Sequence, residues 1–105
     1  MCGLFLAVDP SEYEVETRTI RLHGHVTSVR LERSFWATID HIAGREDIST
    51  ARFVTTLHDE IQERDGEVPN FASLLRVTCL QYLRRPDLHE AEIAARRARR
   101  TENAM

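Results

Sequence analysis

Lysine is absent from this sequence, and glycine, proline and cysteine are scarce. Four Gly and three Pro among 105 residues exclude collagen-like and low-complexity chains. The two cysteines, Cys2 and Cys79, have neither metal-type nor redox-type spacing, so we expect reduced thiols in a cytoplasmic protein and no disulfide framework. No apolar run approaches the roughly 20 residues that a membrane-spanning helix needs. The run at residues 3–8 is also too short for a signal peptide, so we expect no membrane contact.

The length and composition of the chain indicate a small globular domain. A chain of 12.1 kDa with 42% apolar and 30% charged residues has room for one domain, which excludes a large multi-substrate enzyme. All fourteen basic residues are arginine, which favours planar, bidentate contacts. The net charge of −3 argues against a protein that coats nucleic acid over its whole surface, but it allows a local basic patch. We expect no enzymatic activity, no cofactor and no metal.

Two segments near the N-terminus have the pattern of β-strands. Residues 2–8 form an apolar run that ends at the turn signal DPS, which predicts a short strand headed by a buried Cys2. Residues 17–31 alternate between apolar and polar on both sides of Gly24, which predicts a strand, a bend and a second strand. The second of these strands has two faces, one formed by Thr27, Val29 and Leu31 and the other by Val26, Ser28 and Arg30.

The hydrophobic period changes from 2 to 3.6 after Leu31, which predicts a helix over about 33–46. Its apolar stripe consists of Phe35, Trp36, Ile39, Ile42 and Ala43. Ser49 is expected to cap a second helix that Gly66 ends. Asn70 is expected to cap a third helix over 71–83, which is apolar nearly all round. Residues 87–105 are expected to form a solvated helix or a frayed end.

A strand at 26–31 has no obvious partner within the chain, so its backbone groups would be unpaired in a monomer. A second copy is the simplest partner. We therefore expect an obligate homodimer in which two strands pair antiparallel near Ser28. The third helix would then pack across the dimer or join two dimers.

This order of elements resembles the ribbon-helix-helix (Arc/MetJ/CopG-like) DNA-binding fold. The resembling residues are VTSVRL, FWATIDHIA, EDIS and ARFVTTL, which run from about Val26 to Ile61. A wider string over roughly residues 1–85 is similar to a group of small bacterial ribbon-helix-helix-domain proteins. The resemblance implies an α+β, mostly helical fold, namely a ribbon-helix-helix dimer with an N-terminal strand extension and an additional C-terminal helix. Asp47 stands where the family turn often carries Gly, and Asp tolerates the left-handed conformation.

The resemblance also implies a set of DNA contacts. In the family, outward side chains of a two-stranded ribbon read base edges in the major groove, and the N-terminus of the second helix binds a phosphate. The matching base-reading positions are Val26, Ser28 and Arg30, and the matching phosphate-binding positions are Ser49 and Thr50, with Arg33 added. Val26 departs from the polar residue expected there, although it could contact a thymine methyl group.

The charge distribution agrees with DNA binding. Residues 16–33 contain four arginines, Arg18, Arg21, Arg30 and Arg33, against two acids. Residues 40–67 contain eight acids against three arginines, so a basic face would have an acidic back. Together with these charges, the resemblance implies a sequence-specific DNA-binding regulator of bacterial type, a repressor, with double-stranded DNA as its partner. Residues 1–85 would form the domain, with its core at 25–64 and the third helix at 70–85, and residues 86–105 an Arg- and Ala-rich tail.

Several alternatives remain open. The same fold could serve as an antitoxin-like or adaptor module that binds a protein through the third helix or the tail, with DNA binding weak or lost. Covering of the face at 26, 28 and 30 would favour that alternative. His23 and His25, with His41 or His58, could bind a metal, although polar residues at a strand junction are the simpler interpretation. The start MCGLF resembles class II glutamine amidotransferases, but that domain needs far more chain.

Overall fold

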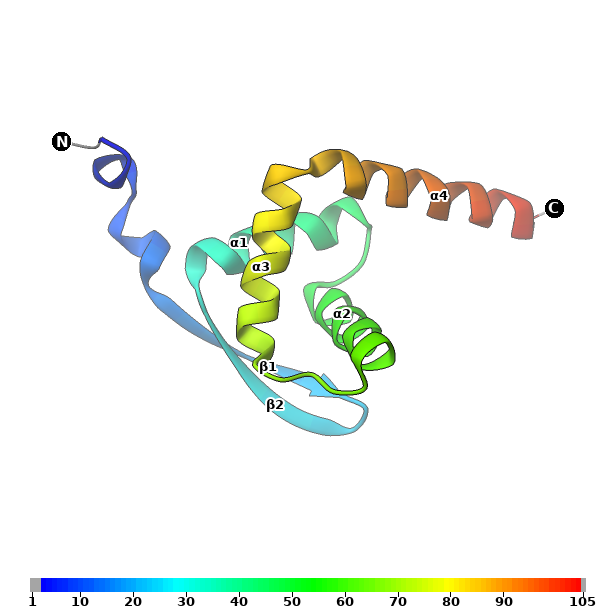
Figure 1. Cartoon of the computed structure of the whole chain (residues 1–105), viewed down its shortest axis with the longest axis horizontal. Coiled ribbons are helices and arrows are strands. Elements are labelled where there is room, and N and C mark those ends of the chain that lie inside the picture. The colour runs from blue at the N-terminus through cyan, green and yellow to red at the C-terminus, as the bar shows by residue number, and fades with distance from the viewer. Residues whose placement is uncertain (1–2, 105) are drawn as a thin grey trace.

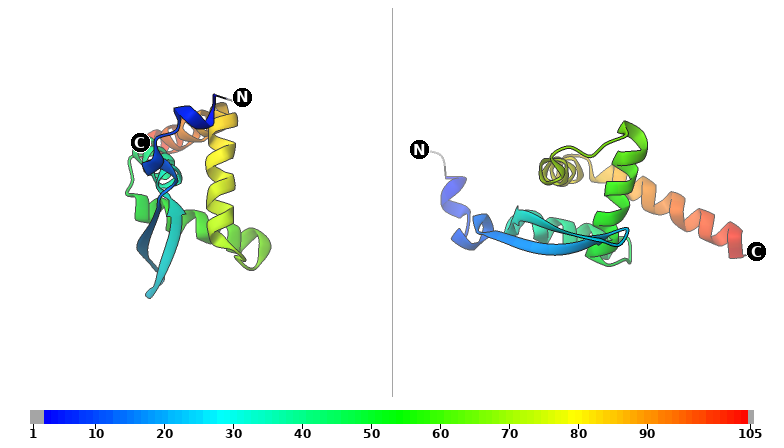
Figure 2. Two further views of the ribbon diagram at one scale, coloured as in Figure 1. Left: turned by 90° about the vertical axis from the view of Figure 1, so that its left-hand side faces the viewer. Right: turned by 90° about the horizontal axis from the view of Figure 1, so that it is seen from below.

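The computed structural model describes residues 3–104 and shows a β-hairpin followed by four helices (Figure 1). Strand β1 is Val15–Leu22 and strand β2 is His25–Glu32. The helices are α1, Arg33–Arg45; α2, Thr50–Asp65; α3, Phe71–Arg84; and α4, Pro86–Ala104. The hairpin runs along one side of the molecule, and the helices lie on its other side (Figure 2).

The predicted strand, bend and strand form one antiparallel hairpin with a two-residue loop, His23-Gly24. Both loop residues have positive φ angles, 49° at His23 and 86° at Gly24, as in the type I′ turns that match the twist of a hairpin. The expectation that the second strand is unpaired within one chain is therefore wrong. Because a two-residue loop returns β2 directly alongside β1, the chain supplies this partner itself.

The predicted strand at residues 2–8 is also wrong for the residues that the structure describes. Phe5–Ala7 form a short 3₁₀ helix, and a second one, Pro10–Tyr13, begins where the Asp9 side chain accepts a hydrogen bond from the Ser11 backbone. Within residues 3–104 the sheet consists of β1 and β2 alone, so an extended conformation of the apolar run would have no ladder to join. Cys2 lies outside the described residues.

The first two helices follow the sequence pattern closely. Helix α1 buries Trp36, Ile39, Ile42 and Ala43. In the turn that follows, Asp47 is left-handed with φ 61°, as expected. Ser49 caps α2 by accepting a hydrogen bond from the Arg52 backbone N–H, and Gly66 ends it with φ 81°.

The core lies between the inner face of the hairpin and helices α1, α2 and α3. Its buried members are Ile20, Val29, Leu31, Trp36, Ile39, Val54, Leu75 and Cys79. The Trp36 indole N–H donates to the backbone carbonyl of Glu16 at 2.8 Å, so the largest core side chain is also hydrogen-bonded. Burial raises the pKa of the Cys79 thiol to about 11, so this free cysteine is an inert core residue.

The third and fourth helices are less completely covered. Asn70 is the N-cap residue of α3 as expected, but its side chain makes no capping bond and its backbone is left-handed. Only Leu75 and Cys79 of α3 are buried, while Val77, Leu80 and Leu83 are exposed. Helix α4 is an ordered helix held to the end of α1 by two ion pairs, Arg45 with Glu90 and Glu46 with Arg96.

Candidate nucleic-acid interface

The outward face of the hairpin is a solvent-exposed surface built from both strands. Val26, Ser28 and Arg30 of β2 are all exposed, as the alternation predicts. Their partners across the ladder are Arg21, Thr19 and Thr17 of β1, which are also exposed. We call these six residues the ribbon face. Helices α1, α2 and α3 pack against the opposite side of the hairpin and leave this face open (Figure 2).

The ribbon face contains two arginines and no acid. Among residues 3–104, neither the Arg21 nor the Arg30 guanidinium has an ion-pair partner. Glu32 follows on the same side of β2, but it is half-buried at the strand end and binds Arg76 of α3 with an N···O distance of 2.9 Å. Both guanidinium groups are therefore open to a ligand in solution.

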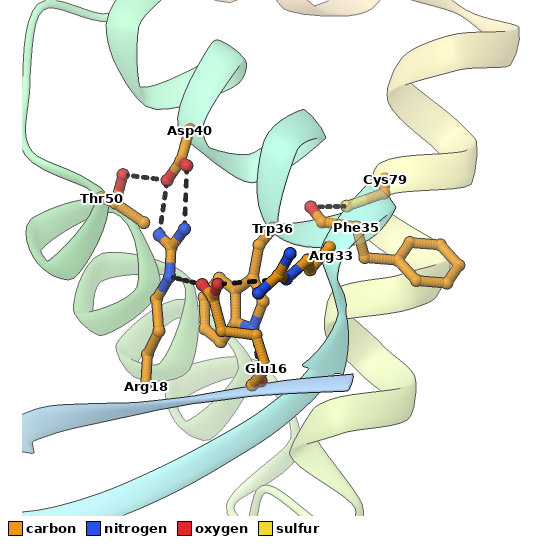
Figure 3. Close-up of polar contacts among 8 residues, drawn as sticks. All are labelled: Glu16, Arg18, Arg33, Phe35, Trp36, Asp40, Thr50 and Cys79. Carbon is orange, nitrogen blue, oxygen red and sulfur yellow. Dashed lines mark hydrogen bonds and ion pairs between the residues drawn. The ribbon is translucent and has the colours of Figure 1, made fainter. Parts of the chain in front are cut away.

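Arg18, by contrast, belongs to the inner face of the hairpin. It makes a bidentate contact with Asp40 of α1 at 2.7 and 3.1 Å and donates to Glu16 at 2.7 Å (Figure 3). Its guanidinium also lies 4.5 Å from the centre of the Trp36 ring. The Asp40 carboxylate raises the pKa of Arg18, and Arg18 in turn lowers the pKa of Asp40. The charge of Arg18 is thus neutralised inside the protein.

Arg33, predicted to bind a phosphate, also lies among acids. Its guanidinium is 3.4 Å from Glu14. It is also 3.7 Å from Glu16 (Figure 3). Two of the four arginines counted at residues 16–33 therefore face carboxylates of this chain. The positive charge of the ribbon face comes from Arg21 and Arg30 alone.

The other predicted phosphate site lies at the start of α2. Ser49 is exposed, and its hydroxyl caps the helix. The Thr50 hydroxyl donates to Asp40 at 2.7 Å, so Asp40 connects β1, through Arg18, with the N-terminus of α2 (Figure 3). The first backbone N–H groups of a helix lack intrahelical acceptors, so they remain available to an anion.

The histidines considered as metal ligands are not gathered into a metal site. Within residues 3–104, no group of three or more His, Cys, Asp or Glu side chains is placed to bind a metal ion. His23 Nε2 instead lies 2.6 Å from an Asp59 oxygen, which connects the hairpin loop to α2.

Sequence reasoning assigned only half of the ribbon face. Thr17, Thr19 and Arg21 were missed because β2 was paired with a second copy rather than with β1. A signal was present: if the loop is two residues long at His23 and Gly24, the register places Arg21 opposite Val26 and Thr19 opposite Ser28.

Comparisons with known proteins agree with the fold. The model of the ribbon-helix-helix domain family matches residues 15–83, which include both strands and most of the first three helices. The chain is also similar to a solved structure of an uncharacterized protein from Bordetella pertussis Tohama I, with 41% identity and a TM-score of 0.75. That match covers 78% of this chain and 66% of the other. No curated protein matches the chain.

Among the described residues, no helix is long and apolar enough to cross a membrane.

Three features of the fold agree with the family match. The hairpin leads directly into α1, the turn after α1 is left-handed, and a serine caps α2. The chain belongs to the ribbon-helix-helix domain family.

Proposed function

We propose that this chain is a sequence-specific DNA-binding transcriptional regulator, a repressor that acts in the cytoplasm by inserting a two-stranded ribbon into the major groove. Ribbon-helix-helix domains are usually DNA-binding regulators. The observation that carries the proposal is the ribbon face, which is exposed, contains two arginines without a carboxylate partner and has no acid. A two-stranded ribbon has the dimensions that the major groove accepts.

In this proposal each residue type on the ribbon face has a chemical role. Arg30 and Arg21 would donate two hydrogen bonds each to guanine O6 and N7. Ser28, Thr17 and Thr19 carry hydroxyl groups that donate or accept, and Val26 can contact a thymine methyl group. Ser28 and Thr19 are opposite each other at the centre of the face, with one arginine toward each end.

The phosphate contacts are proposed at the start of α2. The Ser49 hydroxyl accepts a hydrogen bond from the Arg52 backbone, so its own O–H would donate to the phosphate beside the free backbone N–H groups, whereas the Thr50 hydroxyl is bound to Asp40. Arg33 would reach a phosphate only by leaving Glu14 and Glu16.

We also propose a homodimer. Within residues 3–104, β1 occupies one edge of β2 and leaves the other edge without a strand, so that edge can pair antiparallel with a second copy near Ser28. In this arrangement the two β2 strands form the two-stranded ribbon at the centre of a four-stranded sheet, and the two β1 strands flank it. The exposed α3 could join two such dimers.

One observation favours a second candidate function, a protein-binding module of antitoxin-like or adaptor type. Val77, Leu80 and Leu83 of α3 are 60%, 39% and 62% exposed and are spaced three residues apart, so they can form one apolar patch along the helix. In that case α3 or α4 would bind the partner, and DNA binding would be weak.

Two substitutions separate base reading from phosphate binding. Duplexes are first selected by the wild-type protein from a random library, and affinity is then measured for the selected and a scrambled duplex at two salt concentrations. Arg30→Ala should cost about 1–3 kcal/mol on the selected duplex and flatten the preference. Ser49→Ala should weaken both duplexes alike, because phosphate contacts carry no sequence information.

Arg84→Ala is the matched control, since it removes one exposed arginine at the end of α3 away from the hairpin (Figure 1). It should leave the preference unchanged. Circular dichroism checks that Ser49→Ala, which loses a helix cap, remains folded. The regulator proposal is wrong if the wild type binds neither duplex at low salt, or if Arg30→Ala retains the full preference.

A further inference from the structure

A cavity of about 510 Å³ opens between residues of all four helices. Its volume lies in the range of small-molecule sites in proteins. Apolar side chains form one wall, including the buried Ile42 of α1 and the half-buried Phe53 and Leu57 of α2. Tyr82 of α3 and His89 of α4 continue the lining, and their rings meet edge to face at 5.3 Å. The cavity therefore offers apolar contact to a ligand of modest size.

Four arginines also line this cavity, but only two of them are neutralised within the protein. Arg96 pairs with Glu46 and Glu92, and Arg85 pairs with Asp87. Among residues 3–104, no carboxylate is paired with Arg52 or Arg100. Two guanidinium groups without partners beside an apolar wall are an unusual combination in a molecule that has more acids than bases.

The acids of the lining do not supply the missing partner. The Glu46 side chain is only 5% exposed, and it contacts both Arg96 and His89. Burial and the nearby Arg45 lower the pKa of His89, even though Glu46 Oε2 lies 3.3 Å from its Nε2. Glu60 lies eight residues beyond Arg52 on α2, or about 12 Å along the helix. Burial and the acids Glu92 and Glu63 raise the pKa of Glu60, so no arginine dominates its surroundings.

We propose that this cavity binds an organic monocarboxylate with an apolar body, the carboxylate between Arg52 and Arg100 and the body against Ile42, Phe53 and Leu57. Arginine suits such a ligand because its planar guanidinium donates two parallel hydrogen bonds to a carboxylate. The apolar wall contributes by removing the ligand body from water. Arg52 lies three residues after Ser49, so the bound anion would lie beside the N-terminus of α2.

Decanoate is a suitable probe, and its binding is measured by titration calorimetry on the full chain without DNA. We expect saturable binding of one decanoate per chain. The double variant Arg52→Gln/Arg100→Gln should bind at least tenfold more weakly, and decan-1-ol, which lacks the charge, should show a similar loss with the wild type. Arg97→Gln is the matched control, because Arg97 belongs to α4 but faces a different hollow. It should bind decanoate as the wild type does.

A second variant tests the cavity by volume instead of charge. Thr56 lines the cavity from α2, so Thr56→Trp should fill it and abolish decanoate binding while Arg52 and Arg100 remain. Unsaturable binding, or unchanged affinity in both the Gln double variant and Thr56→Trp, would overturn the proposal. A third outcome would also overturn it. If the wild type sediments as a dimer, Thr56→Trp sediments as a monomer and decanoate binds neither of them, then a second copy of the chain occupies the cavity. These measurements contain no duplex, so they stand or fail independently of DNA binding.

Discussion

Arg18 and Arg30 are both arginines of the hairpin, yet their surroundings give them opposite roles. Arg18 lies on the inner face, where Asp40, Glu16 and the Trp36 ring surround it. Arg30 lies on the ribbon face with no ion-pair partner among residues 3–104. Successive side chains of a strand point to opposite faces, so the position of each arginine in the ladder decides whether it meets solvent or the helices. Local charge counts cannot make this distinction.

The Arg18–Asp40 contact should make stability depend on acid pH. The pKa of Asp40 is lower in the folded chain than in the unfolded chain, so the contact stabilises the fold above about pH 4 and is lost as pH falls through the folded pKa. The two side chains are 33% and 43% exposed, so screening limits the contribution to about 1 kcal/mol. Asp40→Asn should therefore lower the free energy of unfolding by about that amount at pH 7.

Urea unfolding from pH 7 to pH 3 checks this expectation. The difference between wild type and Asp40→Asn should narrow below about pH 4, because protonation removes the charge of Asp40 from the wild type, whereas asparagine has no charge at any pH. Asp65→Asn serves as a comparison, since Asp65 pairs with its sequence neighbour Arg64 on the surface of α2. Equal stability of wild type and Asp40→Asn at pH 7, or a difference that does not change with pH, would contradict the assignment.

At the scale of elements, the two-residue loop of the hairpin has the largest consequence. It places β1 beside β2 in a fixed register and so builds the ribbon face from one chain. The same loop lies close to α2 through the His23–Asp59 contact. We therefore expect a change in the loop conformation to disturb the ribbon face more than a change in the apolar residues of α3 would.

Two glycines allow the loop conformation to be tested with one kind of substitution. Gly24 has φ 86° in the loop, whereas Gly44 lies within α1, and a Cβ at either position meets no atom within 4 Å. Backbone conformation alone should then decide the outcome. Gly24→Ala should destabilise the fold by about 1–2 kcal/mol, because left-handed backbone is costly for alanine. Gly44→Ala should stabilise it by about 0.5–1 kcal/mol, because alanine favours helix.

Chemical denaturation of the two variants measures both changes in the free energy of unfolding, the expected loss for Gly24→Ala and the expected gain for Gly44→Ala. Gly24→Asn provides a further control, since asparagine tolerates positive φ better than alanine and should recover part of the loss. A neutral or stabilising Gly24→Ala would show that the loop does not have this conformation in solution.

At the scale of the whole molecule, the chain is more extended than a compact domain of its size. Its radius of gyration is 15.7 Å, against about 13 Å for a compact chain of this length. Helix α4 leaves the upper end of α3 and runs away from the hairpin (Figure 1). Leu4, Phe5 and Leu6 near the N-terminus are exposed, like the outer residues of α3. An extended shape with exposed apolar groups is typical of a protomer that associates.

We expect the chain to sediment as a dimer at micromolar concentration and its melting temperature to rise with concentration. Val77→Asp/Leu83→Asp introduces charge on α3 and leaves the hairpin unchanged. If the dimer forms through the open edge of β2, this variant remains dimeric and loses only larger species. Analytical ultracentrifugation decides the matter, and a folded monomer at micromolar concentration would rule out the obligate dimer.

The sequence by itself determined the features that depend on neighbours along the chain. Alternation predicted both faces of β2, the change of period predicted α1, and Asp47, Ser49 and Gly66 predicted the turn and both ends of α2. These features follow from backbone preferences and side-chain spacing, which act over a few residues.

Only the tertiary structure decided which distant groups meet. It paired β2 with β1, directed Arg18 to Asp40 across 22 positions, and placed α4 against the end of α1 through Glu46 and Arg96. It also turned the apolar N-terminal run into a 3₁₀ helix, because a strand needs a neighbour that this segment lacks within residues 3–104. Contacts between residues far apart in the chain have no local pattern, so the other half of the ribbon face and the cavity among the helices emerged only once the elements were packed together.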